Sequence, residues 1–395
     1  MYLSRIHRYI FKEISTPTIL SLLIFTFVLL MGRIPRVTEL VISKGVPAGE
    51  IFMLFAYLMP TFFSITVPLS FLLGILLAFG RFSADSEFIA LKASGVSLYN
   101  LIKPVIILAV FFAMLTGWIT VFVEPASKAA FRGKLFQIAS SNLSINIKPG
   151  VFSDDFNGIV LYTRGVNEQL GIMQDLFISD ERSGATPTTI TAQEGRFIPD
   201  PDQLRLTLRL KNGSIHRQPA NQLQSTYQTI KFSSYDINID TGATDGSNKR
   251  KRKRSEMSWN DLNKAIATVT KAKDKHRLEA EKHERIVIAF APLVLVLVGV
   301  PLGLQSQRSG KGAGFAMALV VFLIYYILLS FAGTIAEKGL IPSGIILWLP
   351  NICFFTGGLY FLHRTAVERP LQIFDLPRKL LSAWFKRQTK TGDDQ

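Results

Sequence analysis

Long apolar runs stand near both ends of the chain, and they predict helices that cross a membrane. A spanning helix needs roughly 17–25 mostly apolar residues. Five runs meet this length: Ile51–Phe79, Leu101–Val123, Ile286–Leu304, Phe315–Ala336 and Ile345–Leu362. A sixth begins at Thr18 and stays apolar through Met31 before it meets charged residues. The pattern therefore predicts six spans, three before and three after a long polar middle.

The first part of this middle predicts β-structure. Leucines at every second position from Leu204 to Leu210 alternate with polar residues, which is typical of a half-buried strand. Four further segments have a similar β-rich composition: Ile159–Thr163, Leu176–Ser179, Thr188–Thr191 and Thr226–Ile239. Asn212-Gly213 predicts a hairpin turn. We expect an antiparallel all-β domain over about Ser141–Asp240, closed as a sandwich or a partly open barrel.

A basic segment follows the predicted β domain. Lys249–Arg254 is a run of six cations, and a polar helical stretch from Ser258 leads into the fourth span. Residues 249–285 hold 13 basic and 6 acidic side chains, a net charge of +7. The cationic run is interpreted as a solvated linker or as a contact with anionic lipid headgroups. His276 and His283 are expected on a solvated helix face.

These patterns divide the chain into five parts. The parts are spans one to three with a cytoplasmic helix at 85–93 (1–123), the β domain with its linker (124–248), the basic linker and polar helix (249–285), spans four to six (286–363), and a basic tail (364–395).

Composition agrees with a membrane protein and excludes a simple soluble enzyme. The 395 residues are 48% hydrophobic and only 18% charged, against about 25% charged in ordinary soluble domains. The net charge is +15. Cations gather in the N-terminal stub, the second and fourth loops and the tail, so the positive-inside rule places both termini in the cytoplasm. The single cysteine, Cys353, excludes an intramolecular disulfide.

The sequence offers no catalytic site. The five histidines are scattered, and no HExxH motif or Cys/His ligand set is present. The stretch Gly303–Gly312 resembles a phosphate loop only superficially, because its spacing is wrong and Gly follows Lys311 where Ser or Thr should stand. We predict that the chain binds no cofactor and that any energy comes from an ion gradient or a partner.

Arg33 and Arg36 form the first candidate site, at the outer end of span one. Counting from Thr18 at about 1.5 Å per residue, they lie ~22 Å and ~27 Å along the helix, near the outer headgroups. Their i,i+3 spacing puts them on one face. They could bind the phosphates of an outer-leaflet lipid, or they could be an ordinary snorkelling anchor paired with Glu39.

The second candidate site is the cytoplasmic loop Arg81–Asn100. Asp85, Ser86 and Glu87 open a short amphipathic helix that carries apolar residues and ends at Gly95. The helix could lie on the membrane as a connector. It could instead dock into the groove of a cytoplasmic partner, with Glu87 as a charged contact.

These features resemble the lipopolysaccharide export permease family, LptF and LptG (the YjgP/YjgQ permeases). The resemblance covers nearly the whole chain: the basic end of span one, the motif Ser86–Gly95, the insert, and the pattern Gly339–Asn351. The loop motif is its most specific element. The position of Arg33 and the first two spans favour the LptF branch.

The resemblance implies a bacterial inner-membrane protein with a periplasmic jellyroll-like domain. It implies lipopolysaccharide as the substrate, a heterodimer of LptF and LptG, an LptB-like ATPase dimer that binds ATP, and an LptC-like partner; nucleic acid is not expected. It also places Glu87 in a groove of the ATPase and Arg33 against lipid phosphates, with Arg36 one turn further on. By the same resemblance, the residues expected to contact the ATPase are Asp85, Ser86, Glu87, Ile89 and Leu91.

Two other functions are compatible with the residues. One is a membrane-anchored envelope scaffold that transports nothing. The other is a gradient-driven lipid flippase, which would need an acidic residue buried mid-span. Spans four to six contain no such residue. Co-purification with a soluble ATPase would separate the export permease from both.

Overall fold

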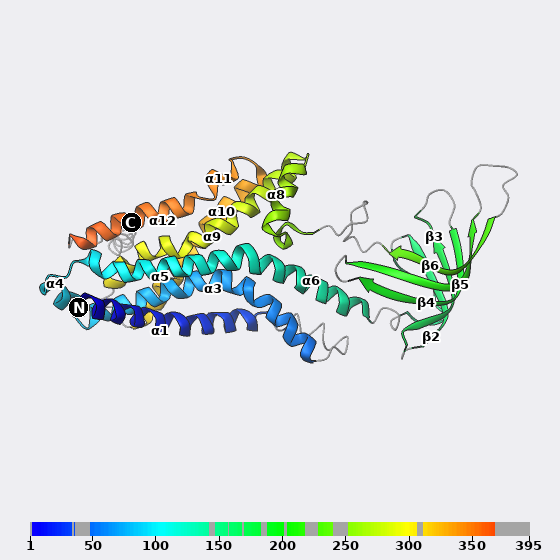
Figure 1. Cartoon of the computed structure of the whole chain (residues 1–395), viewed down its shortest axis with the longest axis horizontal. Coiled ribbons are helices and arrows are strands. Elements are labelled where there is room, and N and C mark those ends of the chain that lie inside the picture. The colour runs from blue at the N-terminus through cyan, green and yellow to red at the C-terminus, as the bar shows by residue number, and fades with distance from the viewer. Residues whose placement is uncertain are drawn as a thin grey trace, which may run out of the picture. The chain divides into compact units, whose positions relative to one another are not determined.

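The protein divides into a helical unit and a β unit (Figure 1). The computed structural model describes residues 2–33, 35, 48–141, 147–156, 158–167, 170–182, 188–200, 204–217, 228–239, 252–305 and 311–367. The helical unit consists of Met1–Gly32, Met59–Pro125 and Ser258–Gln395, and the β unit consists of Arg33–Leu58 and Ala126–Met257. Some helices therefore begin in one unit and end in the other.

Within the described residues, six helices are long and apolar enough to cross a membrane, which confirms the prediction of six spans. The helical elements are α1 (Tyr2–Met31), α3 (Ala48–Ala84), α4 (Glu87–Ala93), α5 (Leu98–Trp118), the π-helical η1 (Ile119–Val123), α6 (Glu124–Ser141), the 3-10 turn η2 (Arg254–Glu256), α8 (Trp259–Thr268), α9 (Ala272–Gln305), α10 (Lys311–Lys338), α11 (Ser343–Ile346) and α12 (Leu349–Ala366). The fourth span is the second half of α9.

Helices α3 and α9 form the centre of the helical unit. In their most apolar stretches 83% and 72% of the residues are buried, against 22–39% in the other four spans. Gly299 and Gly303 lie one turn apart on α9, and a Cβ on either would come within 2.9 Å of Leu72 or Phe79 on α3. Small residues at i,i+4 let two helix backbones approach closely, which is how helices associate where lipid removes the hydrophobic driving force.

Some buried polar groups in the helical unit are paired across helices, and others are paired within one helix. Tyr325 on α10 donates a 2.8 Å hydrogen bond to the Asn351 side chain on α12, and the Asn351 amide donates to the Val287 carbonyl on α9 at 3.1 Å. Arg285 is only 5% exposed and is paired with Glu281 at 3.1 Å. Satisfied groups of this kind fix the relative register of packed helices.

His276 and His283 were predicted to lie on a solvated helix face, but both are half-buried. A Cβ on Gly339 would come within 2.5 Å of the His276 ring, and one on Gly344 within 3.3 Å of the His283 ring. His276 therefore packs against Gly339, just after α10, and His283 packs against Gly344 of α11. The glycines lie in a distant part of the chain, so helical spacing alone did not indicate this contact.

The described strands of the β unit form one antiparallel sheet, which confirms the inserted all-β domain. Its strands are β1 (Ser153–Phe156), β2 (Ile159–Asn167), β3 (Ile172–Asp180), β4 (Thr188–Asp200), β5 (Arg205–Arg217) and β6 (Gln228–Ile239). They pair in sequence order, β1 to β6. A jellyroll would cross over through Greek-key connections, whereas these described strands form a curved meander (Figure 1). One face carries the apolar core.

The hairpin predicted at Asn212-Gly213 is wrong, because both residues lie inside β5. Asn212 has φ 51° and Gly213 does not have a positive φ, so the pair does not form the two-residue turn. Gly213 is needed instead for a close approach. A Cβ there would collide with the Thr191 carbonyl oxygen on β4 and lie 2.5 Å from the Phe232 ring on β6.

Asn212 belongs to a row of irregular residues that crosses the sheet. In each of the five strands β2 to β6, the alternation of core-facing and outward side chains shifts by one residue at the same level. The row consists of Arg164, Asp175, Gln193, Asn212 and Ser233, as judged from the pairs on either side of it. Asp175 also has a positive φ, 52°. Such irregularities bend and twist strands. Because each strand from β2 to β6 has one, the pairing register between neighbouring strands is the same before and after the row.

Replacing Gly213 with Ala should weaken the sheet beside this row. The added methyl must displace a backbone carbonyl, and overpacking of this kind costs about 1–3 kcal/mol. We expect faster amide hydrogen exchange in β4 to β6 of the full-length protein in detergent. Gly165→Ala is the matched control, because a Cβ there meets only Gln174 at 3.6 Å. Equal exchange in the two variants would contradict the role of Gly213.

The end of the basic run is held within the β unit. Glu256 of η2 is 5% exposed and pairs with Arg132 on α6 at 3.0 Å. Arg252 and Lys253 are exposed. Lys249, Arg250 and Lys251 lie outside the described residues, so the interpretation of the whole run as a flexible linker stays a prediction.

Candidate functional site

The short helix predicted in the second loop is present as α4, and local backbone geometry sets its limits. Ser86 has φ 56° and turns the chain sharply after α3, and Glu87 then begins the helix. Gly95, with φ 85°, follows the end of the helix, where its N–H donates to the Lys92 carbonyl. A left-handed residue just beyond the last turn is the usual way to end a helix.

The two faces of α4 have different environments. Phe88 and Leu91 are partly buried against the helical core that includes Ile10 and Phe82. Ile89 on the other side is 56% exposed. Of the predicted contact residues, Asp85, Ser86 and Ile89 are exposed, whereas Glu87 and Leu91 are half-buried. The helix is thus fixed on one side and open on the other.

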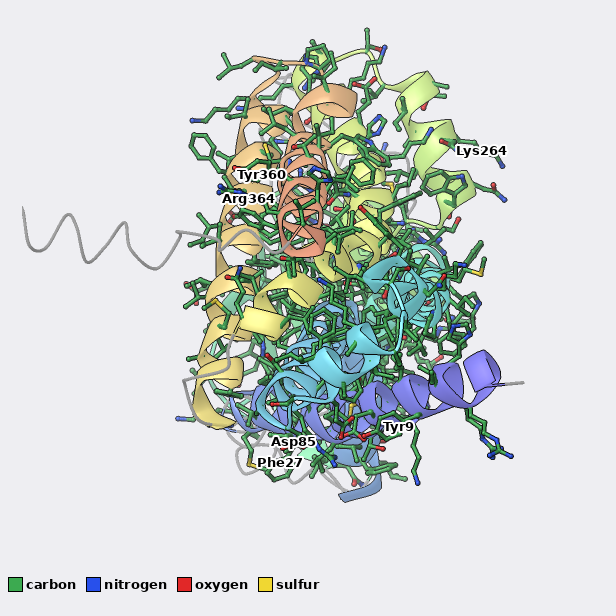
Figure 2. The ribbon with its side chains drawn as sticks, turned by 90° about the vertical axis from the view of Figure 1, so that its left-hand side faces the viewer. Tyr9, Phe27, Asp85, Lys264, Tyr360 and Arg364 are labelled. Carbon is green, nitrogen blue, oxygen red and sulfur yellow. The ribbon has the colours of Figure 1, made fainter. Side chains whose placement is uncertain are left out.

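A polar network joins α4 to α1 and α3 at this end of the unit. Figure 2 labels two of its residues, Tyr9 and Asp85. The Tyr9 hydroxyl on α1 donates to the Glu87 carboxylate, at 3.2 Å to Oε1 and 3.0 Å to Oε2. Arg81, in the last turn of α3, pairs with Glu13 on α1 and with Asp85 at 3.3 Å. The Tyr9 and Glu13 contacts link α1 to α4 and to α3. The contact between Arg81 and Asp85 links the last turn of α3 to the residue that follows it.

Sequence reasoning missed this network. It identified Glu87 and Asp85 but treated Arg81 only as a cytoplasmic cation that sets topology. Tyr9 lies 78 residues from Glu87, and Glu13 lies 68 residues from Arg81. The available signal was weak: Tyr9 and Glu13 stand four residues apart on α1 and therefore share a helix face.

The other candidate site is only partly described. Arg33 follows α1 directly, after Gly32, whose N–H donates to the Val28 carbonyl. The Arg33 side chain is exposed, and within the described ranges no ion pair involves it. Arg36 and Glu39 lie outside the described residues. The guanidinium of Arg33 is therefore accessible.

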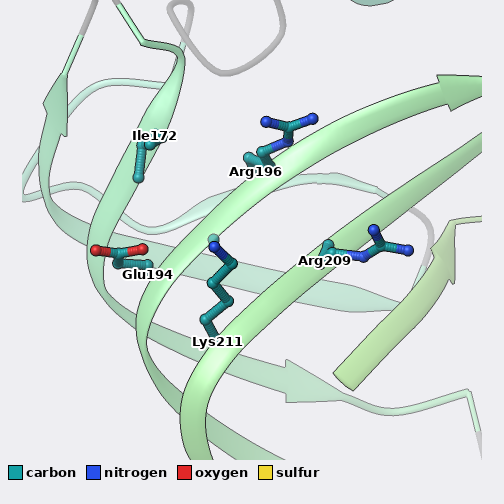
Figure 3. Close-up of a pocket in the computed structure, with 6 residues that line it drawn as sticks. Ile172, Glu194, Arg196, Arg209 and Lys211 are labelled. Carbon is teal, nitrogen blue, oxygen red and sulfur yellow. The ribbon is translucent and has the colours of Figure 1, made fainter. Parts of the chain in front are cut away.

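A pocket of about 240 Å³ lies on the outward face of the β-sheet (Figure 3). Its lining consists of Ile172, Glu194, Gly195, Arg196, Arg209 and Lys211. Arg209 makes two 2.8 Å bonds to Asp236 on β6, and these hydrogen bonds lower the pKa of the Asp236 carboxyl below its ordinary value. Glu194 stands opposite Lys211 on the paired strand. Arg196 stands opposite Arg209, so the lining of the pocket is mostly basic even though Arg209 pairs with Asp236.

Metal chemistry has no visible support. Over the described ranges, no three His, Cys, Asp or Glu side chains lie together in a way that could hold a metal ion. The arrangement supports binding rather than a reaction. Helix α4 offers a charged side that is open to a partner, and the exposed guanidinium of Arg33 follows the apolar helix α1.

Together these observations define a class of protein: a multi-pass membrane protein whose spanning helices are interrupted by a β domain. The sequence profile described as "Lipopolysaccharide export system permease LptF/LptG" matches residues 8–364. The chain therefore belongs to the LptF/LptG family of lipopolysaccharide export permeases, as the resemblance implied.

Individual relatives are more distant. The chain is 23% identical over 269 residues to the lipopolysaccharide export system permease protein LptF of Escherichia coli (strain K12), covering 64% of this chain and 72% of that protein. The LptF protein of Shigella flexneri shows the same values. An uncharacterized protein of Rickettsia prowazekii is 23% identical over 190 residues, which cover 48% of this chain and 52% of that protein.

Proposed function

We propose that this chain is the transmembrane subunit of an ATP-driven exporter that extracts lipopolysaccharide from the outer leaflet of the inner membrane and passes it to a periplasmic β bridge. Its partners are a paralogous permease in an LptF–LptG heterodimer, an LptB-like ATPase dimer and an LptC-like protein. The similarity to LptF proteins supports the LptF position. The chain itself binds no cofactor; the ATPase partner binds ATP.

One structural observation supports the ATP-driven part of this proposal. Helix α4 connects two spans, is fixed against the core through Phe88 and Leu91, and leaves Ile89 and part of Glu87 open. A short helix held in this way can transmit a push or pull to the spans on either side of it. The distribution of cations supports a cytoplasmic position for both termini and α4, with the β unit in the periplasm.

The proposed cycle uses shape change and no covalent chemistry. Lipopolysaccharide enters laterally between two permeases, its phosphates meet Arg33 and Arg36, and its acyl chains lie against apolar helix surfaces. ATP binding by the partner displaces α4, the cavity narrows, and the lipid moves towards the β unit. The ATPase must therefore favour one of two permease conformations over the other.

Arg33→Glu tests the lipid contact. Charge-assisted hydrogen bonds contribute about 1.5–3 kcal/mol each, so reversing this charge should slow ATP-dependent lipopolysaccharide release from proteoliposomes by roughly ten- to a hundredfold. Lys338→Glu, which reverses an exposed cation at the end of α10, should have little effect.

The same assay distinguishes the other interpretations. Normal lipid crosslinking and release in Arg33→Glu would show that Arg33 is only a snorkelling anchor. Wild-type protein that neither co-purifies with an ATPase nor moves lipid would support an envelope scaffold. Lipid movement driven by an ion gradient without ATP would support a flippase.

A further inference from the structure

We propose that Tyr9 is a positioning residue that holds the Glu87 carboxylate ready for the ATPase, so that α1 and α4 act as one body at the docking site. This inference deepens the proposed function and rests on it. Glu87 was identified from the loop motif alone, whereas the role of Tyr9 follows from the contact between α1 and α4.

The Tyr9 hydroxyl contacts both oxygens of the Glu87 carboxylate. The hydroxyl lies 3.2 Å and 3.0 Å from the two carboxylate oxygens, so it donates across the pair and approaches from the α1 side. The Tyr9 ring lies against Phe82 with a centroid distance of 5.6 Å. The ring is 40% exposed and contacts Phe82, and its hydroxyl donates to Glu87.

The Glu87 carboxylate can accept more hydrogen bonds than the one that Tyr9 donates. An ionised carboxylate accepts about four hydrogen bonds, and a single hydroxyl uses only part of that capacity. Tyrosine carries no positive charge, so this contact is a hydrogen bond and not an ion pair. The half-buried side chain is therefore restrained on one side and can still accept from a cationic side chain of a partner, preferably the two parallel bonds of an arginine.

A chain of ion pairs lies next to the contact between Tyr9 and Glu87. Glu13, four residues after Tyr9 on α1, pairs with Arg81, and Arg81 also pairs with Asp85 immediately before α4. Tyr9 and Glu13 thus hold the start of α4 at two points through the same face of α1. Because α1 leads directly to Arg33, a displacement of α4 is passed to the helix that precedes the proposed lipid contact.

Restraint of this kind improves affinity because less side-chain freedom is lost on binding. Tyr9→Phe removes the hydroxyl and keeps the ring on Phe82. We expect it to weaken binding of the LptB-like ATPase to the purified full-length permease complex by about five- to tenfold. Tyr99→Phe is the matched control, since Tyr99 is 54% exposed in the first turn of α5; this variant should bind the ATPase normally.

A double-mutant cycle with Glu87→Gln separates positioning from simple packing. Binding of the ATPase is measured for Tyr9→Phe, Glu87→Gln and the double variant, after thermal melting confirms that all three are folded. If Tyr9 acts through the charged carboxylate, Tyr9→Phe adds less than twofold once Glu87 is Gln. A purely structural tyrosine would weaken binding equally in both backgrounds, and that result would overturn the inference.

The cycle also distinguishes this inference from the proposed function. Loss of affinity in Glu87→Gln with no change in Tyr9→Phe would overturn the role of Tyr9 and leave the docking role of Glu87 intact. Unchanged affinity in Glu87→Gln would overturn both. Tighter binding in Tyr9→Phe would show that the tyrosine competes with the ATPase for Glu87, which also contradicts positioning.

Discussion

Replacing Glu87 with Arg should abolish the stimulation of the ATPase by the permease and remove the ATPase from the purified complex. The substitution removes the carboxylate that we place against a cation of the partner and introduces a repelling charge there. Breaking a buried charge pair at an interface costs about 2–5 kcal/mol, and charge reversal adds repulsion. Binding should therefore weaken by about a hundredfold or more.

Two further variants make this prediction specific. Glu87→Gln keeps the shape of the side chain and should retain intermediate binding. Glu194→Arg reverses an exposed carboxylate in the β unit and should leave co-purification and ATP hydrolysis unchanged. Normal coupled ATPase activity in Glu87→Arg would contradict the docking role and leave α4 as a connector that lies on the membrane.

The second large effect is expected for Gly74→Val, at the crossing of α1 and α3. A Cβ at this position would collide with the Thr18 hydroxyl and lie 3.0 Å from the Ile14 carbonyl oxygen. Thr18 is 1% exposed, and its hydroxyl already donates to that carbonyl at 2.7 Å. The hydroxyl cannot turn away without leaving a buried group unsatisfied, which adds to the cost of overpacking.

We expect Gly74→Val to destabilise the helical unit by about 3 kcal/mol, seen as a lower melting temperature and lower yield of monodisperse protein in detergent. Gly333→Val is the matched control, because no heavy atom lies within 4 Å of a Cβ built there on α10. Similar melting temperatures in the two variants would show that α1 is not held closely against α3.

The layout of the fold could be read from local patterns. Each span is a mostly apolar run of spanning length, and a helix satisfies its own backbone hydrogen bonds in lipid. The alternating leucines of β5 likewise indicated a half-buried strand, since side chains in a strand alternate between faces. What failed was the use of Asn212-Gly213 as a turn. The same pair suits a bend inside a strand, and only the neighbouring strands β4 and β6 decide between them.

The candidate sites could be predicted only in part. The motif around Glu87 and the cations after α1 stand out because charged residues are costly beside apolar runs. The environment of Glu87 could not be predicted, because Tyr9 reaches it only after α1 has packed beside α3. The same applies to His276 and His283, whose packing partners are glycines in a later part of the chain.

The sequence by itself determined that this protein has six spans around an inserted β domain, because hydrophobicity and its period act residue by residue along the chain. Only the tertiary structure decided which surfaces of these elements meet. It buried α3 and α9, bent the sheet along one row, and joined Tyr9 to Glu87. Such contacts depend on the shapes of side chains far apart in the sequence, and close packing selects among them.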